Sequence, residues 1–343
     1  MACSIILLYY YCYAEIKSQA RRGRMIGNND KKIPMGVSSC LLGNEVRFDG
    51  GHKHDRYITG TLGNYFEFVA VCPEVECGLS IPRESMRLVG DPESPRLVTS
   101  RSGLDLTEQM NGWVQKRVRE LAKEDLCGFI FKSKSPSSGM ERVKVYDRNN
   151  VPRAVGVGLF ARAFKENFPL LPVEEEGRLH DIVLRENFIE SVFVYQRWRD
   201  MISSFTPKCL VAFHTEHKLL LRAHSEKHYR ELGRLVAAAG AMEPEELLSS
   251  YQQCLMAAMK LKPTVKKHVN VLMHMMGYFK NYLSGDEKQE LLEVIERFKN
   301  YYVPLVVPIT LMNHYVRKYN EPYLQNQYYL NPHPTELKLR NHA

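Results

Sequence analysis

Three short apolar runs in the first half of the chain each end in residues suited to chemistry. Ile33–Ser39 leads into Cys40, Phe66–Val71 leads into Cys72-Pro73-Glu74, and Leu126–Phe131 leads into a loop of lysines and serines at 132–139. Apolar runs of this length, bounded by turn-forming residues, predict buried strands. The stretches between them can form helices, so the pattern predicts strand–helix–strand units.

Helical spacing is clearest over 104–123, where Leu106, Met110 and Val114 fall on one broad face. A short helix is expected over 59–65 and another over 158–167, followed by a fourth strand over 168–173. Parallel strands joined in this way bind ligands beyond their carboxyl ends. We therefore expect the residues that follow the strands to meet at one edge of the sheet.

From residue 184 the pattern changes to long helical periodicity without a convincing strand. The expected helices after the linking helix cover 208–238, 244–260, 264–283, 286–302 and 304–319. The sequence thus predicts an α/β N-terminal domain with a mostly parallel sheet, followed by an all-α helical domain. We divide the chain into an uninformative extension (1–32), the α/β domain (33–183), a linking helix (184–204) and the helical domain (205–343).

Composition indicates a soluble globular protein, with 44% hydrophobic and 25% charged residues. The net charge of +8 is a mild bias toward anionic partners. The apolar stretch 2–13 is shorter than the ~20 residues that span a bilayer, and its positive charges follow it, unlike those of a signal peptide. We expect a cytoplasmic protein that does not contact a membrane, with a cleaner start at Met25.

The eight cysteines do not form a disulfide framework, because grouped cysteines in a reducing cytoplasm more often bind metal or react. In Cys72-Pro73-Glu74 the proline fixes the turn, and the carboxylate could act as a base or hold a metal-bound water. Cys77 follows Cys72 by five residues, so the two thiolates could share a metal or a cluster. The alternative for Cys77 is a free thiol in a loop, and for Cys40 a buried cysteine at a strand end.

Two further features of the α/β domain suit an anion. The backbone N–H groups of Ser135–Gly139 could form an anion nest beside Lys132 and Lys134, although a plain polar turn explains the same residues. Arg83, which follows Ile81-Pro82, is a second candidate for holding a phosphate.

The helical domain carries a histidine stripe and a lysine cluster. Four histidines fall on one helical stripe: His214, His217, His224 and His228. His224 and His228 have the spacing of a metal-binding pair. The alternatives are a polar helix face or a surface that contacts RNA phosphates. Lys260, Lys262, Lys266 and Lys267 surround Pro263 and suit a polyanion, unless they form only a solvated face.

The motifs of the α/β domain together resemble the thiouracil desulfidase family over about 33–175. They are Ser39-Cys40-Leu-Leu-Gly43 with Arg47-Phe-Asp-Gly50, then Cys72-Pro-Glu74, then Lys134-Ser-Pro-Ser-Ser-Gly139. The C-terminal part resembles the YbgA-like domain through His214–Lys218, Tyr301–Pro308 and Tyr323–Leu330. The fusion of both resembles the enzymes that remove sulfur from 4-thiouridine in tRNA.

This resemblance implies a 4Fe–4S cluster held by three cysteines, with one open iron that binds the substrate's sulfur as a Lewis acid. Water then replaces sulfur at the carbon without net electron transfer. Cys40 and Cys72 match the first two ligands, Glu74 the catalytic glutamate and Ser135 the active-site serine. The expected substrate-binding residues are Arg83, Lys132, Lys134, Ser137 and Ser138.

The third ligand departs from the family pattern Ser-Pro-Ser-Cys-Gly, because Ser138 stands at the cysteine position. Cys77 stands where the family usually has a residue that is not a ligand. Our hypothesis is that the ligand has moved to Cys77; Ser138, or no third ligand, is the alternative. Three thiolates and a water would also suit zinc.

The leading functional hypothesis is iron–sulfur-dependent, non-redox desulfuration of 4-thiouridine in tRNA, with tRNA bound by Lys260, Lys262, Lys266 and Lys267. The basic helical domain favours tRNA, because a free base needs no accessory domain. The alternatives are a desulfidase of free thiouracil or thiolated nucleotides, and a non-catalytic, metal-containing RNA-binding protein. No obligate protein partner is inferred.

Overall fold

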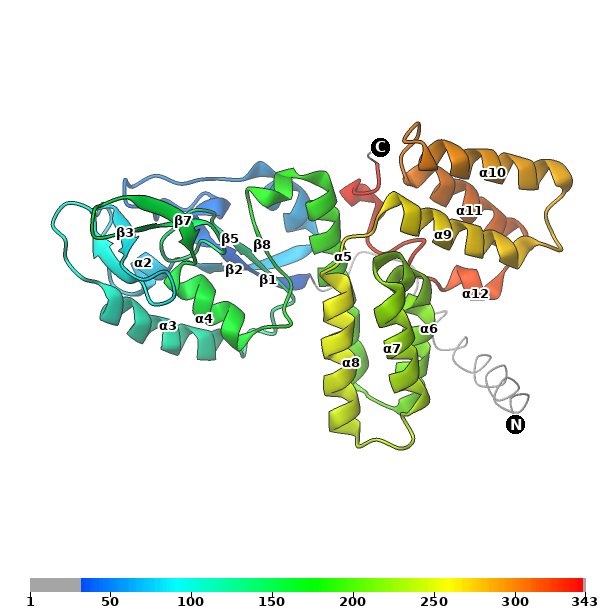
Figure 1. Ribbon diagram of the computed structural model, residues 1–343, viewed down its shortest axis with the longest axis horizontal. Helices are drawn as coiled ribbons and strands as arrows, with labels where there is room; N and C mark the ends of the chain where they lie inside the picture. Colours follow the sequence, from blue (N-terminus) through cyan, green and yellow to red (C-terminus); the bar gives the residue numbers. More distant parts are fainter. Residues whose placement is uncertain (1–31, 342–343) are drawn as a thin grey trace. The chain divides into compact units, whose positions relative to one another are not determined.

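The computed structural model describes residues 32–341. The expected N-terminal extension, apart from Lys32, and the expected start at Met25 lie outside the described residues. Strands occur in the first half of the described chain and helices dominate the second (Figure 1). The predicted fold class, an α/β domain with a parallel sheet followed by helices, is confirmed.

The first sheet has four parallel strands in the order β2-β1-β5-β8. They are β1 (Ile33–Ser38), β2 (Phe66–Val71), β5 (Phe129–Phe131) and β8 (Val173–Glu175). The predicted positions of the first three strands are confirmed. The fourth strand was wrongly placed at 168–173, because Phe168–Pro172 forms the turn after the preceding helix and pairing begins at Val173.

Both faces at the centre of this sheet are covered, which explains why β1 and β5 are largely apolar, whereas β2 carries the exposed Glu67 and β8 carries two glutamates. Phe129 and Phe131 pack on one side with Met110 and Phe164, from helices α3 (Thr107–Leu121) and α4 (Leu159–Asn167). Met35, Val37 and Ile130 pack on the other side. Gly36 is required in β1, because an added Cβ would lie 2.1 Å from the ring of Phe129.

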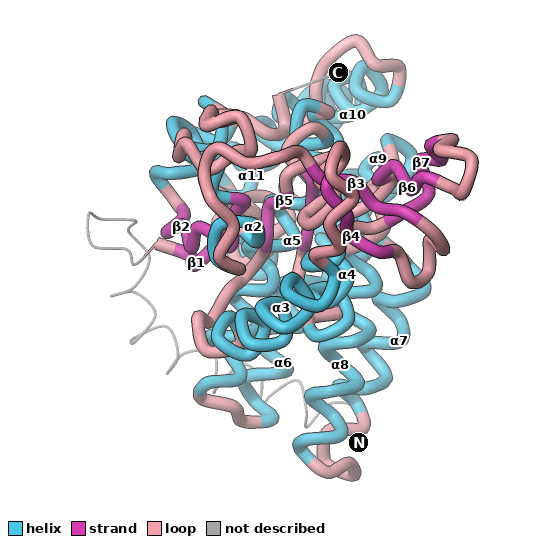
Figure 2. The backbone as a smooth tube through the Cα atoms, turned by 90° about the vertical axis from the view of Figure 1, so that its left-hand side faces the viewer, coloured by secondary structure: helices cyan, strands magenta, loops and turns pink. Residues whose placement is uncertain are grey.

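A second four-stranded sheet was not predicted from the sequence. Its strands, in the order β4-β3-β6-β7, are β3 (Met86–Val89), β4 (Arg96–Thr99), β6 (Val143–Tyr146) and β7 (Pro152–Gly156). In Figure 2 these strands lie to one side of β1, β2 and β5. Only the central pair, β3 and β6, is parallel, and the two outer pairings are antiparallel.

Helix α5 (Ile182–Ser203) joins the two halves through its packing. Its first half contributes Phe188, Ile189 and Val192 to the core of the first sheet. Its second half contributes Trp198 to the core of the helical region, where the indole stacks on Tyr251 at 5.1 Å. Asp181 caps the helix by accepting hydrogen bonds from the N–H groups of Val183 and Leu184.

Within the described chain, the helical region contains six further α-helices of twelve or more residues and one short α-helix. They are α6 (Pro207–His224), α7 (Glu226–Ala237), α8 (Pro244–Met259), α9 (Val265–Met276), α10 (Gly285–Lys299), α11 (Val306–Lys318) and α12 (Pro322–Gln325). The single helix expected over 208–238 is wrong. Ser225 is extended and caps α7 through the N–H of His228, so the helix breaks there.

The C-terminal segment returns to the α/β half. Leu337 and Leu339 are buried in the core of the first sheet. Arg340 is buried and pairs with Glu186 and Glu190 of α5, at 3.3 and 2.9 Å. None of the helices in the described part of the chain is both long and apolar enough to cross a membrane.

Candidate active site

A cavity of about 410 Å³ lies at the carboxyl ends of β1, β2 and β5. β1 passes into the short helix Ser39–Leu42, β2 into the helix α2 (Pro73–Glu76), and β5 into the serine-rich loop. The cavity therefore lies at the edge of the sheet where the candidate site residues were expected to meet. The expected site residues that line the cavity are Cys40, Cys72, Glu74, Arg83, Lys132, Lys134, Ser135 and Ser138.

The two cysteines of the cavity wall are almost completely buried, each with 9% of its surface exposed. Burial raises the pKa of the Cys40 thiol to about 11. Burial, and then the neighbouring carboxylate of Glu74, raise the pKa of the Cys72 thiol to about 12. Both side chains are thus neutral thiols at pH 7 without a metal, and a bound metal would displace their protons.

Glu74 is held by two side-chain hydrogen bonds. Its Oε1 accepts from the hydroxyl of Ser137 at 2.5 Å, and its Oε2 accepts from the thiol of Cys72 at 3.5 Å. The hydroxyl of Ser135 lies 2.9 Å from that of Ser137. Because the Ser137 hydrogen is donated to Glu74, Ser135 must be the donor to Ser137. A directed chain of hydroxyls, Ser135 to Ser137 to Glu74, therefore orients the carboxylate.

The serine loop is a tightly packed turn. The N–H groups of Ser137 and Ser138 donate to the hydroxyl oxygen of Ser135, at 3.3 and 3.1 Å. The carbonyl of Ser137 accepts from Phe160 at the start of α4, and an added Cβ at Gly158 would lie 2.4 Å from that carbonyl oxygen. These bonds support the polar-turn interpretation, since the N–H groups of Ser137, Ser138 and Gly139, which were proposed for an anion nest, already donate within the loop.

Basic side chains surround the cavity. Lys132 pairs with Glu176, which follows β8 and also accepts from the Ser133 N–H at 2.6 Å. Arg83 donates to the carbonyl of Val46 at 2.9 Å. Lys53 and Lys134 also line the cavity, and neither has an ion-pair partner among residues 32–341. This excess of positive charge suits an anionic substrate.

Cys77 lies outside the wall of the cavity, because it is not one of the described residues that line it. It follows α2, and its thiol donates to the backbone carbonyl of Glu74 at 3.2 Å. Its remaining surface packs against the core that includes Met110 and Phe129. Ser137 also does not line the cavity, but it contacts Glu74 directly.

Sequence reasoning gave no site role to Arg47, Phe48, Lys53 or Glu176, although Arg47 and Phe48 belong to the motif Arg47-Phe-Asp-Gly50. The first three belong to the loop after Cys40, which folds back over the cavity because the Lys53 N–H donates to the Cys40 carbonyl at 2.9 Å. The two glycines after Phe48 are typical of a turn, but they do not indicate the direction in which the loop runs.

The histidine stripe does not form a metal pair. His224 is fully buried and bonds Glu190 at 2.8 Å, and His228 bonds the capping hydroxyl of Ser225 at 2.8 Å. His214 is buried and bonds the hydroxyl of Tyr251 at 3.1 Å. No group of three or more metal-ligating side chains of His, Cys, Asp or Glu occurs anywhere within residues 32–341. The metal interpretation of the stripe is therefore wrong.

The lysine cluster divides into two kinds of residue. Lys267 is structural, since its ammonium donates to the carbonyl of His224 at 2.5 Å and so caps the end of α6. Lys260 is exposed and donates to the carbonyl of Pro169 at 3.1 Å. Lys262 and Lys266 are exposed.

Comparison with known proteins assigns a family to each half of the chain. The family model for 2-thiouracil desulfurase matches residues 35–176, and a model described as a protein of unknown function, DUF1722, matches 218–334. The uncharacterized protein YbgA of Escherichia coli is 30% identical over 137 residues, which cover 40% of this chain and 81% of YbgA. The uncharacterized protein YbbK of Bacillus subtilis is 32% identical over 108 residues, covering 30% and 71%.

Among solved structures, a 4Fe–4S-dependent thiouracil desulfidase, TudS, is 28% identical with a TM-score of 0.36. The match covers 46% of this chain and 97% of TudS. The order of the two family matches agrees with the order of the two folded regions. The chain belongs to the 2-thiouracil desulfurase family through its α/β domain, to which a DUF1722 domain of the YbgA type is fused.

Proposed function

We propose that this protein is an iron–sulfur-dependent enzyme that converts 4-thiouridine in tRNA to uridine. The observation that carries the proposal is the single cavity that brings Cys40, Cys72 and the oriented carboxylate of Glu74 together at one edge of the sheet. In the reaction, a carbon–sulfur double bond and water become a carbon–oxygen double bond and hydrogen sulfide. No electrons are gained or lost. The free thiols suit a cytoplasmic location.

The residues of the cavity fit a 4Fe–4S cluster with one ligand position altered. Cys40 and Cys72 would supply two thiolates, the ligands that iron–sulfur clusters require. For the third position, the cavity wall favours the buried Ser138. The assignment to Cys77 stays a prediction, which the variants described in the Discussion test. When bound, the cluster would supply a Lewis acid for the soft thiocarbonyl sulfur.

The proton steps fall to the chain's own residues. Glu74 would take a proton from the attacking water, because it is the carboxylate among the described residues of the wall. The Ser137 hydroxyl fixes the position of its Oε1 and leaves the remaining lone pairs to the cavity. Lys53, Lys134 and Arg83 would hold the phosphate that accompanies the thiolated base.

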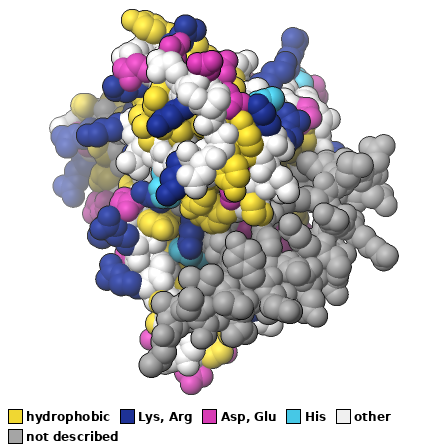
Figure 3. Space-filling view, turned by 90° about the vertical axis from the view of Figure 1, so that its right-hand side faces the viewer, with side chains coloured by type: hydrophobic (Ala, Val, Ile, Leu, Met, Phe, Trp, Pro, Cys, Tyr) yellow, Lys and Arg dark blue, Asp and Glu magenta, His cyan; other side chains and the backbone are white. Residues whose placement is uncertain are grey.

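The choice of tRNA as substrate is supported by the fused basic domain. Lys260, Lys262 and Lys266 are exposed, as RNA phosphate contacts require. On the face of the molecule in Figure 3, Lys and Arg side chains occur at several separate places, not in a single patch. The RNA surface that we propose is therefore one region of the domain, not its whole exterior.

Two other functions remain as defined alternatives. A desulfidase of free thiouracil or of thiolated nucleotides would use the same cavity without the helical domain. A non-catalytic, metal-containing RNA-binding protein is favoured by one feature, the serine at position 138 in place of a third thiol.

A comparison of substrates tests the proposal. Anaerobically prepared full-length protein is incubated with tRNA that contains 4-thiouridine, with free 4-thiouracil and with 4-thiouridine monophosphate. We expect the highest kcat/KM for the tRNA, measured by loss of the thiocarbonyl absorbance and by nucleoside analysis. Turnover of the small substrates without action on tRNA would establish the first alternative, and tRNA binding without any turnover would establish the second.

A further inference from the structure

A second hollow of about 580 Å³ lies beside the cavity of the active site. We call it the junction groove, because it is bounded by the turn after α4, by α5 and by the end of α8 with the residues that follow it. Its floor is apolar and includes Phe168, Leu171, Phe188 and Met256. Neither the family descriptions nor the proposed chemistry assigns this hollow a role.

The rim of the junction groove is positively charged. Lys165, Arg178, Lys260 and Lys262 line it, against the single carboxylate of Glu174 among the described lining residues. The carboxylate of Glu174 forms an ion pair with Arg178 at 2.6 Å, and Glu141 pairs with the same guanidinium at 3.0 Å. The three lysines have no ion-pair partner within residues 32–341. Their charges are thus uncompensated at the rim.

The junction groove and the active-site cavity have no lining residue in common, but residues two positions apart in the chain line the one and the other. Glu176 binds Lys132 and Ser133 of the cavity, while Glu174 and Arg178, two residues to either side, line the groove. In the loop between β5 and β6, Ser138 lines the cavity and Met140 lines the groove. The N–H of Met140 donates to Glu175 at 2.7 Å and so joins the two segments. A chain-like ligand with one unit in the cavity can therefore continue into the groove.

We propose that the junction groove binds the RNA segment adjacent to the nucleotide that reacts. This inference rests on the proposed function, which places a nucleotide of an RNA chain in the cavity. Phosphates of the neighbouring nucleotides pair with Lys165, Lys260 and Lys262, and the apolar floor accepts a base or sugar. Phosphate contacts of this kind hold RNA in register without reading its sequence.

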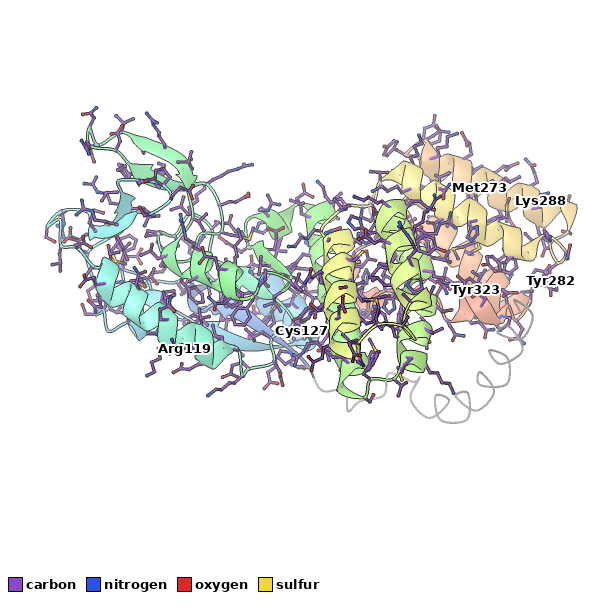
Figure 4. All side chains as sticks on the ribbon, turned by 60° about the horizontal axis from the view of Figure 1, so that its bottom comes forward. Arg119, Cys127, Met273, Tyr282, Lys288 and Tyr323 are labelled. Atoms are coloured by element: carbon purple, nitrogen blue, oxygen red, sulfur yellow. The ribbon has the colours of Figure 1, made fainter. Side chains whose placement is uncertain are left out.

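Binding of non-thiolated tRNA tests the inference separately from the chemistry. The groove variant is Lys165→Glu/Lys262→Glu, since both lysines are exposed and neither has an ion-pair partner in the described part of the chain. The matched control is Lys116→Glu/Lys288→Glu. Both lysines are exposed and lie outside the groove, Lys116 on α3 and Lys288 on α10 (Lys288 is labelled in Figure 4). Dissociation constants are measured for the full-length proteins over a range of salt concentrations.

We expect the groove variant to bind tRNA more weakly and its log–log salt slope to flatten by about 1.4–1.8, because two phosphate contacts are lost at ~0.7–0.9 each. The control should keep the wild-type slope. The neutral pair Lys165→Gln/Lys262→Gln should show the same flattening and guards against misfolding caused by charge reversal. Equal slopes for groove and control variants, or no tRNA binding by the wild type, would overturn the inference. Failure of the proposed chemistry would instead appear as tRNA binding with an intact slope but no uridine product.

Discussion

Cys72→Ser is expected to abolish both cofactor retention and desulfuration. Cys72 is one of two thiols in the wall of the cavity, and a serine oxygen is a hard donor that replaces thiolate poorly at iron. The protein should lose its brown absorbance and most of its iron and sulfide after anaerobic purification. The same result is expected for Cys40→Ser. Iron and acid-labile sulfide analysis provides the measurement, with activity on thiolated tRNA as a second readout.

Three further variants provide a control for this prediction and locate the third ligand. Cys209→Ser is the matched control, because that thiol lies at the start of α6, outside the cavity wall, and bonds the hydroxyl of Thr206. Ser138→Cys should increase iron retention if Ser138 occupies the third ligand position, and Cys77→Ser should then leave it unchanged. Loss of iron from Cys77→Ser alone would place the third ligand at Cys77. Full iron content in Cys72→Ser would refute the cluster site.

Glu74→Gln is expected to lower kcat/KM for thiolated tRNA by ~10²–10⁴, the usual contribution of a general base. Glutamine is nearly isosteric and can still accept the hydrogen bond from Ser137, but it cannot take a proton from water. Iron content should therefore equal that of the wild type. Steady-state kinetics on reconstituted protein, normalised to iron, measures the effect.

Glu120→Gln serves as its control, because Glu120 lies on the exposed face of α3 and pairs there with Lys116 and Arg117. Glu76 is unsuitable for this purpose, since its carboxylate accepts from the Cys72 N–H at 2.7 Å and holds the ligand loop. If Glu74→Gln turned over at the wild-type rate, the base would have to be another group, and the hydroxyl chain of Ser135 and Ser137 would have only a structural role.

The central strands were predictable because they are short, mostly apolar runs bounded by turn-forming residues, as in Phe66–Val71 and Leu126–Phe131. The second sheet was not, because strands such as Met86–Val89 have only four residues and their pairing is decided by distant partners. The break at Ser225 was missed because apolar spacing continues across it.

The chemistry of the cavity was predictable where it follows strand ends, as for Cys40, Cys72 and Glu74. Lys53 could not be placed, because its position depends on the loop that returns to the Cys40 carbonyl. The position of Cys77 could not be predicted either, since the short helix α2 places its thiol against the backbone carbonyl of Glu74, to which it donates a hydrogen bond. Spacing along the chain does not report such turns.

The most direct test of the central claim is the origin of the new oxygen in the product. Holoprotein is incubated anaerobically in ¹⁸O-labelled water with tRNA that contains 4-thiouridine, and the digested nucleosides are analysed by mass spectrometry. The account predicts one uridine with a single ¹⁸O atom for each sulfide released and no requirement for an added reductant or oxidant. Unchanged 4-thiouridine, or uridine that carries no label, would contradict it.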